Sequence, residues 1–205
     1  MNPHPGLLGW GIHFFIQNAL DVTCYNCLVN LVLLPGNSAN NKEWIEEIQR
    51  TIGPLFEHST IQYYKHWETG ASIIDLEEEL SVLAKTVESI GEFTVFAKSA
   101  GIIVALKGVY DGRLKLAQCV FVGMPVEWSR TNGFDIDVWI KNYSVPTLFI
   151  QATSDPACHY EDLQAYIGDM NVENCILSEV GGNNHDYENL LELRAEVEKF
   201  LEKGK

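Results

Sequence analysis

One serine stands at a point in the sequence where a strand would turn sharply into a helix. Residues 92–98 form an apolar, β-rich run that ends at Ser99, and a second apolar run of helical length begins at Ala100. A tight strand-to-helix turn exposes the side chain at its corner, beside the N–H groups that start the helix. Side chains two positions before and after the corner crowd each other, so Ala97 and Gly101 must be small. A nucleophile would therefore lie at Ser99.

An acid and a histidine follow two later apolar runs. Asp155 comes after the run over 145–151, and His185 comes after the run over 175–180. Because ligands bind beyond the carboxyl ends of parallel strands, we expect both side chains at the same edge as Ser99. An unassisted hydroxyl is a poor nucleophile at neutral pH, but an imidazole can take its proton and a carboxylate can hold the imidazole. The order serine, aspartate, histidine thus predicts acyl-transfer chemistry.

This pattern resembles that of the α/β-hydrolase family. The nucleophile turn of the family reads G-x-S-x-G, whereas the run over 97–101 reads A-K-S-A-G, with alanine in place of the first glycine. The chain order of the three residues also matches, as does the glycine-rich loop 181–186 that contains the histidine. The resemblance covers nearly the whole chain from the first predicted strand onward. It implies that Ser99 attacks, that His185 acts as base and then as acid, and that Asp155 orients the imidazole.

The same resemblance implies an oxyanion hole, in which each donor can contribute about 3 kcal/mol. The backbone N–H of Ala100 would be one donor. The other would come from the loop after the first core strand, Pro35-Gly36-Asn37-Ser38, whose Pro-Gly-Asn sequence matches a related group of small hydrolases. We expect the N–H of Asn37 in this role, or that of Ser38 if the register differs by one.

Each predicted catalytic residue also has a plain structural alternative. A serine before a helix is most often its cap, an Asp-Pro sequence such as 155–156 is often only a turn, and a loop histidine is often a surface residue. Two substitutes are available in the same loops. Glu127 is the alternative acid if Asp155 points away, and His159 is the alternative base.

Residues 123–145 interrupt the alternation of elements and hold more aromatic area than a connector needs. We interpret them as a small cap-like insertion that gives a substrate pocket an apolar wall. Met124 and Trp128 of this segment, with His66 from the loop after the second strand, are the predicted substrate-binding residues. For Lys98, next to the nucleophile, the sequence suggests only an ion pair with one of the many carboxylates.

The elements that position these residues alternate along the chain. Strands are predicted at 28–34, 59–64, 92–97, 116–122, 145–151 and 175–180, and helices at 41–56, 75–90, 100–106, 160–167 and 190–201, with Asn40 or Asn41 and Asp75 as caps. Such alternation predicts a single-domain, three-layer α/β/α sandwich with a mostly parallel sheet of about six strands. Segment 1–27 fits either an amphipathic helix or an irregular cover on the sheet.

Composition limits the domain count and the class of partner. A chain of 205 residues suits one domain, 1–205, and a formal charge of −14 argues against nucleic acid or an anionic membrane as partner. The five cysteines lie mostly in apolar runs, and the pair Cys24 and Cys27 lacks the context of a redox or zinc motif. Stretch 7–20 is too short and too polar to span a bilayer, so we expect a cytoplasmic protein.

These features predict a serine hydrolase that cleaves small or medium carboxylic esters or thioesters, or amides, through an acyl-enzyme on Ser99. Its partner would be a small ester or acyl compound, and no metal or organic cofactor is implied. A non-catalytic binding or scaffold protein of the same fold is the alternative. A nucleotide-binding protein is disfavoured, because no G-x-G-x-x-G and no G-x-x-x-x-G-K-[ST] follows any strand.

Overall fold

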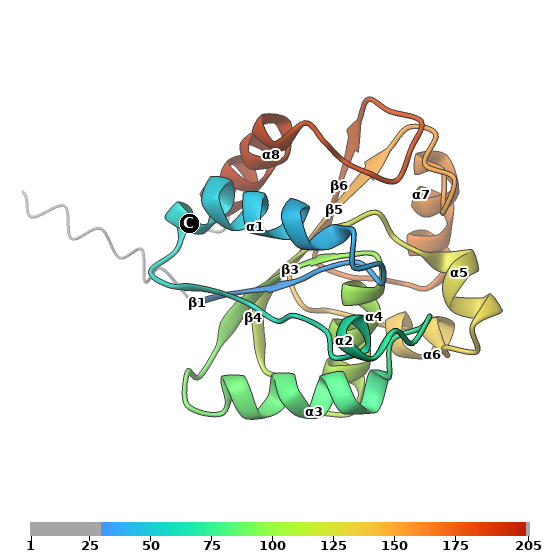
Figure 1. Cartoon of the computed structure of the whole chain (residues 1–205). Coiled ribbons are helices and arrows are strands. Elements are labelled where there is room, and N and C mark those ends of the chain that lie inside the picture. Colours follow the sequence, from blue (N-terminus) through green and yellow to red (C-terminus); the bar gives the residue numbers. More distant parts are fainter. Residues whose placement is uncertain (1–29, 204–205) are drawn as a thin grey trace, which may run out of the picture.

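A parallel β-sheet of six strands forms the centre of the molecule (Figure 1). The structure is a computed structural model, and it describes residues 30–203. The strands are β1 (Asn30–Leu34), β2 (Ser59–Ile61), β3 (Phe93–Lys98), β4 (Leu116–Val122), β5 (Thr147–Ala152) and β6 (Cys175–Val180). Their order across the sheet is β2-β1-β3-β4-β5-β6, and every neighbouring pair is parallel. The predicted α/β class with a six-stranded sheet is confirmed.

Helices cover both faces of this sheet. They are α1 (Asn41–Ile52) with the 3₁₀ turn η1 (Gly53–Leu55), α2 (His66–Thr69), α3 (Leu76–Val87), α4 (Ala100–Tyr110), α5 (Val126–Thr131), α6 (Ile136–Ile140), α7 (Tyr160–Asp169) and α8 (Leu190–Lys203). Helices α1 and α8 pack together on one face, and α3 and α4 pack together on the other (Figure 1). Because both faces are covered, the strands need apolar residues on both sides, which is why they read as continuous apolar runs.

Two apolar clusters fill the space between the sheet and its helices. The cluster under α1 and α8 includes Ile48 and Val197, and the cluster under α3 and α4 includes Leu80 and Ile103. Truncating one such buried side chain to alanine destabilises a protein by roughly 2–5 kcal/mol. The strand ends are therefore firmly supported, and the loops that follow them start from fixed points.

Strand β2 is shorter than the predicted run over 59–64, because a buried carboxylate holds the chain that follows it. Glu79 of α3 is 1% exposed. It accepts hydrogen bonds from the side-chain amide of Gln62 (2.8 Å) and from the backbone N–H of Lys65 (2.7 Å). These contacts turn the chain away from the sheet, and the short helix α2 follows, which the sequence analysis did not predict.

The helix caps and the insertion 123–145 match the sequence analysis only in part. Asp75 caps α3 as predicted, because its side chain accepts a hydrogen bond from the N–H of Glu78 (3.0 Å). Of the two predicted caps of α1, Asn40 takes the N-cap position but its side chain makes no capping bond, and Asn41 is the first residue of the helix. The predicted cap-like insertion, residues 123–145, contains two short helices, α5 and α6. Segment 1–27 lies outside the described residues.

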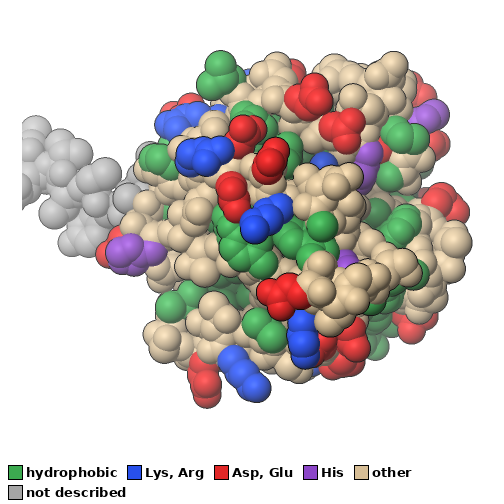
Figure 2. Space-filling model, viewed as in Figure 1, with side chains coloured by type: hydrophobic (Ala, Val, Ile, Leu, Met, Phe, Trp, Pro, Cys, Tyr) green, Lys and Arg blue, Asp and Glu red, His purple; other side chains and the backbone are tan. Residues whose placement is uncertain are grey.

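Acidic side chains are spread over the face shown in Figure 2, with lysine and arginine side chains between them. Among the described residues, exposed ion pairs include Arg130 with Glu127 (2.7 Å) and with Asp137 (3.0 Å). Pairs of this kind contribute at most about 1 kcal/mol to stability. Across residues 30–203, no helix has the length and apolar character needed to cross a membrane.

Candidate active site

Ser99 lies at the corner between β3 and α4, in a conformation that residues other than glycine rarely adopt. Its φ is 50° and its ψ is −116°. Strain of this kind costs about 1–3 kcal/mol and clusters at functional sites. The N–H of Ser99 donates to the carbonyl oxygen of Val122 (3.1 Å), which ties the turn to β4. The side chain makes no capping bond to α4, so the alternative of an ordinary helix cap is wrong.

Gly101 is small because α4 begins directly against the end of β1. A Cβ atom at position 101 would lie 2.5 Å from the carbonyl oxygen of Leu34, far inside van der Waals contact. The first turn of α4 therefore packs on the point where loop 35–38 begins. Ala97, which stands where the family pattern has glycine, is fully buried within β3.

Asp155 follows β5 and is fully buried. Its carboxylate accepts hydrogen bonds from Nδ1 of His185 (2.8 Å to Oδ2 and 3.0 Å to Oδ1), from the hydroxyl of Tyr187 (2.6 Å) and from the N–H of Ala157 (2.8 Å). A buried carboxylate is tolerated only when it is paired and hydrogen-bonded, and these donors satisfy that condition. Asp155 is therefore more than a turn residue, and His185 is more than a surface residue.

Tyr187 is a site residue that the sequence analysis missed. Its hydroxyl donates to Oδ2 of Asp155 and accepts a hydrogen bond from the N–H of Ala152 (3.1 Å). Burial, and then the charge of Asp155, raise the pKa of Tyr187, so that the phenol remains a donor. The only trace of this role in the sequence is an aromatic residue in an otherwise polar loop.

Gly123, at the end of β4, leaves room for the imidazole of His185. Its φ is +67°, and a Cβ atom there would lie 2.7 Å from Cε1 of His185 and 2.9 Å from Cε2 of Tyr187. The histidine ring thus packs directly on the backbone at the strand end. Any side chain at position 123 would displace it.

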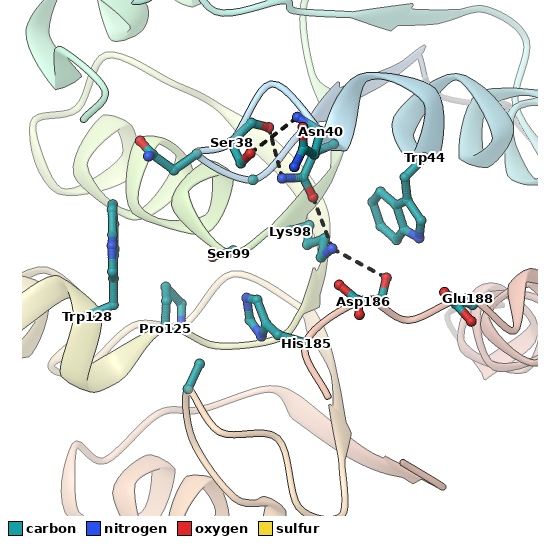
Figure 3. A pocket seen from close by; sticks show the side chains of 14 residues that line it. Ser38, Asn40, Trp44, Lys98, Ser99, Pro125, Trp128, His185, Asp186 and Glu188 are labelled. Carbon is teal, nitrogen blue, oxygen red and sulfur yellow. Dashed lines mark hydrogen bonds between the residues drawn. The ribbon is translucent and has the colours of Figure 1, made fainter. Parts of the chain in front are cut away.

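Ser99 and His185 line the same cavity (Figure 3). Within residues 30–203, the side-chain hydrogen bonds of His185 go to Asp155, and none joins its ring to the hydroxyl of Ser99. The bond from Nδ1 fixes the ring and leaves Nε2 for another partner. In enzymes without substrate the contact between nucleophile and base is often long and shortens on binding.

Asn37, the predicted oxyanion residue, is held on almost every side. Its Oδ1 accepts a hydrogen bond from the N–H of Ile74 (2.9 Å), and its Nδ2 donates to the carbonyl oxygen of Ser72 (2.8 Å). Its own carbonyl oxygen accepts from Nε2 of His66 and from Nε1 of Trp67, both at 2.7 Å. The backbone N–H is the one polar group of Asn37 that finds no partner in the described part of the chain.

Ser38 and Ala100, the other predicted donors, are placed in a similar way. The carbonyl oxygen of Ser38 accepts from the N–H and the Nδ2 of Asn41, both at 2.9 Å, and its Oγ accepts from the N–H of Asn40 (3.2 Å). The N–H groups of Ser38 and Ala100 have no protein partner among residues 30–203. Unpaired N–H groups at a helix start suit an anion, and their use as an oxyanion hole remains a prediction.

The cavity around Ser99 has a volume of about 580 Å³. It is lined by Gly36, Asn37, Ser38, Asn40, Asn41, Trp44, Lys98, Ser99, Pro125, Trp128, Ala157, His185, Asp186 and Glu188. Pro125 and Trp128 lie on one side of Ser99, and Lys98 and Trp44 lie on the other (Figure 3). The first side is therefore apolar, and the second combines an indole with a charged group.

Two of the three predicted substrate-binding residues do not line this cavity. Met124 is 1% exposed and belongs to the core. His66 is 6% exposed, bonds to Asn37 and lines a smaller hollow behind that residue. Met124 was assigned as part of the insertion 123–145 and His66 from the loop after the second strand, and packing turns both side chains inward. Trp128 does line the cavity.

The two substitute residues lie away from the cavity. Glu127 pairs with Arg130 (2.7 Å), and His159 lies 3.8 Å from Asp162, both on the exposed surface. Neither residue lines the cavity around Ser99. The geometry therefore favours Asp155 over Glu127 as the acid and His185 over His159 as the base.

Lys98 is buried beside Ser99 and does not form the ion pair that was expected. Its Nζ donates to Oδ1 of Asn41 (3.0 Å) and to the carbonyl oxygen of Asp186 (3.3 Å), and lies 4.6 Å from the centre of the Trp44 ring. Burial lowers the pKa of Lys98 to about 8, although the charges of Asp186 and Asp155 act in the opposite direction.

The next candidates are the residues that could bind a metal ion or take part in redox chemistry. Cys24 and Cys27 lie outside the described residues. Between residues 30 and 203, no three histidine, cysteine or acidic side chains come together as they would around a metal ion.

Many solved structures share this fold. A serine hydrolase involved in carbazole degradation is 13% identical, with a TM-score of 0.64 over 85% of this chain and 91% of that one. A cold-adapted esterase from an Arctic intertidal metagenomic library is 15% identical (TM-score 0.62; 86% and 81%), and a monoacylglycerol lipase from Paleococcus ferrophilus is 14% identical (TM-score 0.59; 84% and 94%). The sequence matches no protein-family model and no curated protein. At these identities the likeness concerns the fold.

Proposed function

Because this chain has the α/β-hydrolase fold, we propose that it is a serine hydrolase that cleaves small or medium carboxylic esters or thioesters. Ser99 is the nucleophile, His185 the general base and acid, and Asp155 the residue that orients the imidazole. The N–H groups of Asn37 and Ala100 form the oxyanion hole, with Ser38 as the alternative to Asn37. The ligand is a small acyl compound.

One observation carries this proposal. A serine in a strained strand-to-helix turn lines the same cavity as a histidine whose Nδ1 is bonded to a buried aspartate at 2.8 Å. Three separate strand ends supply the three side chains. A turn aspartate has no reason to bond to a histidine that shares a cavity with a strained serine, whereas acyl transfer needs this set.

In the acylation step, Oγ of Ser99 attacks the acyl carbon while Nε2 of His185 takes the hydroxyl proton. The carbonyl oxygen becomes an oxyanion, and the N–H groups of Asn37 and Ala100 donate to it. His185 then gives the proton to the leaving alcohol or thiol, and the acyl group remains on Ser99. The negative charge of Asp155 stabilises the imidazolium that exists between these proton transfers.

In the deacylation step, a water molecule is the nucleophile and Ser99 is the leaving group. Nε2 of His185 takes a proton from the water as its oxygen attacks the acyl carbon, and the same donors stabilise the second oxyanion. The proton then returns to Oγ of Ser99 as the carboxylic acid leaves. The enzyme is restored with no net change in its charge.

The cavity supports the assignment to small and medium substrates. Its volume of about 580 Å³ falls within the range of small-molecule pockets. Pro125 and Trp128 give one side an apolar surface that suits a short alkyl or aryl acyl group. The polar residues on the other side suit a more polar leaving group.

Steady-state hydrolysis of p-nitrophenyl esters of increasing acyl length, with matched thioesters and anilides, tests this proposal. We expect turnover of esters or thioesters, with a preference for short and medium chains. A fluorophosphonate probe should label the wild-type protein covalently and should leave the Ser99→Ala variant unlabelled. Ser154→Ala, an exposed serine of the loop after β5, is the matched control and should be labelled like wild type.

Two results would overturn the assignment. Labelling that persists in Ser99→Ala would place the nucleophile elsewhere. No turnover of any ester, thioester or anilide, together with no labelling of the wild type, would favour the non-catalytic binding protein. In that case tight binding of a substrate analogue in the same cavity would be the next measurement.

A further inference from the structure

Lys98 carries a charge into the interior directly beside the predicted nucleophile. The residue is 4% exposed, and its ammonium contacts two neutral oxygens and one aromatic ring. Burying a charge is unfavourable unless partners compensate for it. Methionine would fill the same space without this penalty, so the charge itself needs an explanation.

The partners of Lys98 come from two segments on opposite sides of it. Asn41 and Trp44 lie on α1, and Asp186 is the residue after His185 (Figure 3). Trp44 also donates from its Nε1 to the carbonyl oxygen of Tyr187 (3.0 Å). Lys98 and Trp44 together therefore hold the backbone of the two residues that follow His185.

Asn41 extends the same network to the predicted oxyanion loop. While its Oδ1 accepts from Lys98, its Nδ2 donates to the carbonyl oxygen of Ser38 (2.9 Å). The ammonium thus lies where three segments meet. These are the loop after β1, the turn after β3 and the loop after β6, and each carries a group that the proposed chemistry uses.

We propose that Lys98 is a positioning residue, whose ammonium group ties the loop that carries His185 to α1 and so sets the imidazole relative to Ser99. This inference rests on the proposed function, and it adds a residue outside the three that react. Charged donors make stronger hydrogen bonds than neutral ones, and only a cation is attracted to the face of Trp44. Arginine, with a larger planar group, and methionine, with no donor, would both fail to replace it.

The inference predicts a loss of activity at alkaline pH. The pKa of Lys98 is lowered to about 8, chiefly by burial. The other titratable groups at the cavity are Asp186 and Glu188 of the same loop, together with His185 and its partner Asp155. Carboxylates remain charged through this range, so the loss above pH 8 reports the lysine. Activity that depends on the ammonium is present below about pH 8 and declines above it.

Lys98→Met, Lys98→Arg and the control Lys107→Met test the inference. Lys107 lies on α4, its Nζ also faces an indole ring, that of Trp139 at 5.5 Å, and it does not line the cavity around Ser99. We expect Lys98→Met to lower kcat about 10- to 100-fold with KM changed by less than about threefold, as for a misplaced catalytic group. Its kcat should also lose the decline near pH 8, while the control keeps the wild-type profile.

A second measurement does not depend on activity. Hydrogen exchange of the amides over 183–189 should accelerate about tenfold or more in Lys98→Met and stay unchanged in Lys107→Met, because local opening sets the exchange rate. Unchanged exchange in this loop overturns the inference, as does a Lys98→Met enzyme with the wild-type kcat and pH profile. If the wild type neither turns over esters nor reacts with fluorophosphonate, the proposed function fails, and the exchange result still decides whether Lys98 holds the loop.

Discussion

Tyr187 donates its hydroxyl hydrogen to the buried carboxylate of Asp155 over 2.6 Å, while Nδ1 of His185 donates to the same oxygen over 2.8 Å. The aspartate is thus held by two side chains of one loop, separated by one residue. The phenol fixes the carboxylate, and the carboxylate fixes the imidazole. A residue that never reaches the cavity around Ser99 therefore influences the predicted base.

Removal of that hydroxyl should weaken both the fold and the activity. Tyr187→Phe leaves Oδ2 of Asp155 with one donor fewer and the N–H of Ala152 without its partner. We expect a loss of about 1–3 kcal/mol in the free energy of unfolding and a kcat about tenfold lower. Urea unfolding and ester kinetics measure the two effects. Tyr110→Phe, at an exposed tyrosine, is the control, and a Tyr187→Phe enzyme that matches it would contradict this role.

Position 123 should tolerate nothing larger than glycine. In Gly123→Ala the new methyl group would lie 2.7 Å from the imidazole of His185, so the ring must move and kcat should fall about 100-fold or more. Gly133→Ala separates this clash from backbone strain, because Gly133 also has a positive φ (+75°) but open space around it. Equal activities of the two variants would show that the imidazole does not depend on the contact.

Trp67 should affect the rate and leave substrate binding unchanged. Trp67→Phe removes one of the two donors to the carbonyl oxygen of Asn37. If the N–H of Asn37 stabilises an oxyanion, its misplacement acts on the transition state, so we expect kcat to fall about tenfold with KM unchanged. Trp139→Phe on α6 is the control. A rise in KM with kcat intact would assign Trp67 to ordinary substrate binding.

The buried charge of Lys98 should make stability depend on pH in a defined direction. Its pKa is about 8 in the folded protein against 10.5 for the free side chain. Below pH 8 the lysine is protonated in both the folded and the unfolded state, so the folded protein bears the full cost of burying the ammonium. Between pH 8 and 10.5 the unfolded chain binds more protons, so the free energy of unfolding rises with pH, by about 3 kcal/mol in total.

Comparison with Lys98→Met separates the contribution of Lys98 to the pH dependence of stability from that of the other titrating groups. The free energy of unfolding of the wild type, relative to that variant, should increase between pH 8 and 10.5 in urea titrations. A constant difference across this range would mean that the lysine is charged throughout. Together with the kinetics, this tests whether the protein gives up stability to keep a cation beside Ser99.

Local patterns in the sequence were enough to predict the strands of the sheet and the order of the loops that carry Ser99, Asp155 and His185. Runs 116–122 and 175–180 match β4 and β6 residue for residue. The apolar run fits the central strand β4, whose second half is buried. The pairing of Asp155 with His185 followed from the topology. Chemistry at strand ends can be predicted in this way because parallel strands bring their carboxyl ends together.

Contacts between segments far apart in the sequence could not be predicted from local patterns. Helix α2 forms around the buried carboxylate of Glu79, and the run 77–79 looks in the sequence like a solvated face. His66 follows a strand, as a site residue would, but packing turns it toward the carbonyl oxygen of Asn37. The partners of Lys98 lie up to 88 positions away along the chain and those of Tyr187 up to 143, and no periodic pattern encodes such pairs.

The close approach of Gly101 to the carbonyl oxygen of Leu34 has a dynamic consequence. With 2.5 Å left for a Cβ atom, the helix behind the serine and the strand before residue 37 can neither slide nor separate without breaking the packing of the sheet. The start of the helix after Ser99 and the strand end before loop 35–38 are therefore held firmly against each other. Trp128 of α5 lines the same cavity and takes no part in this contact.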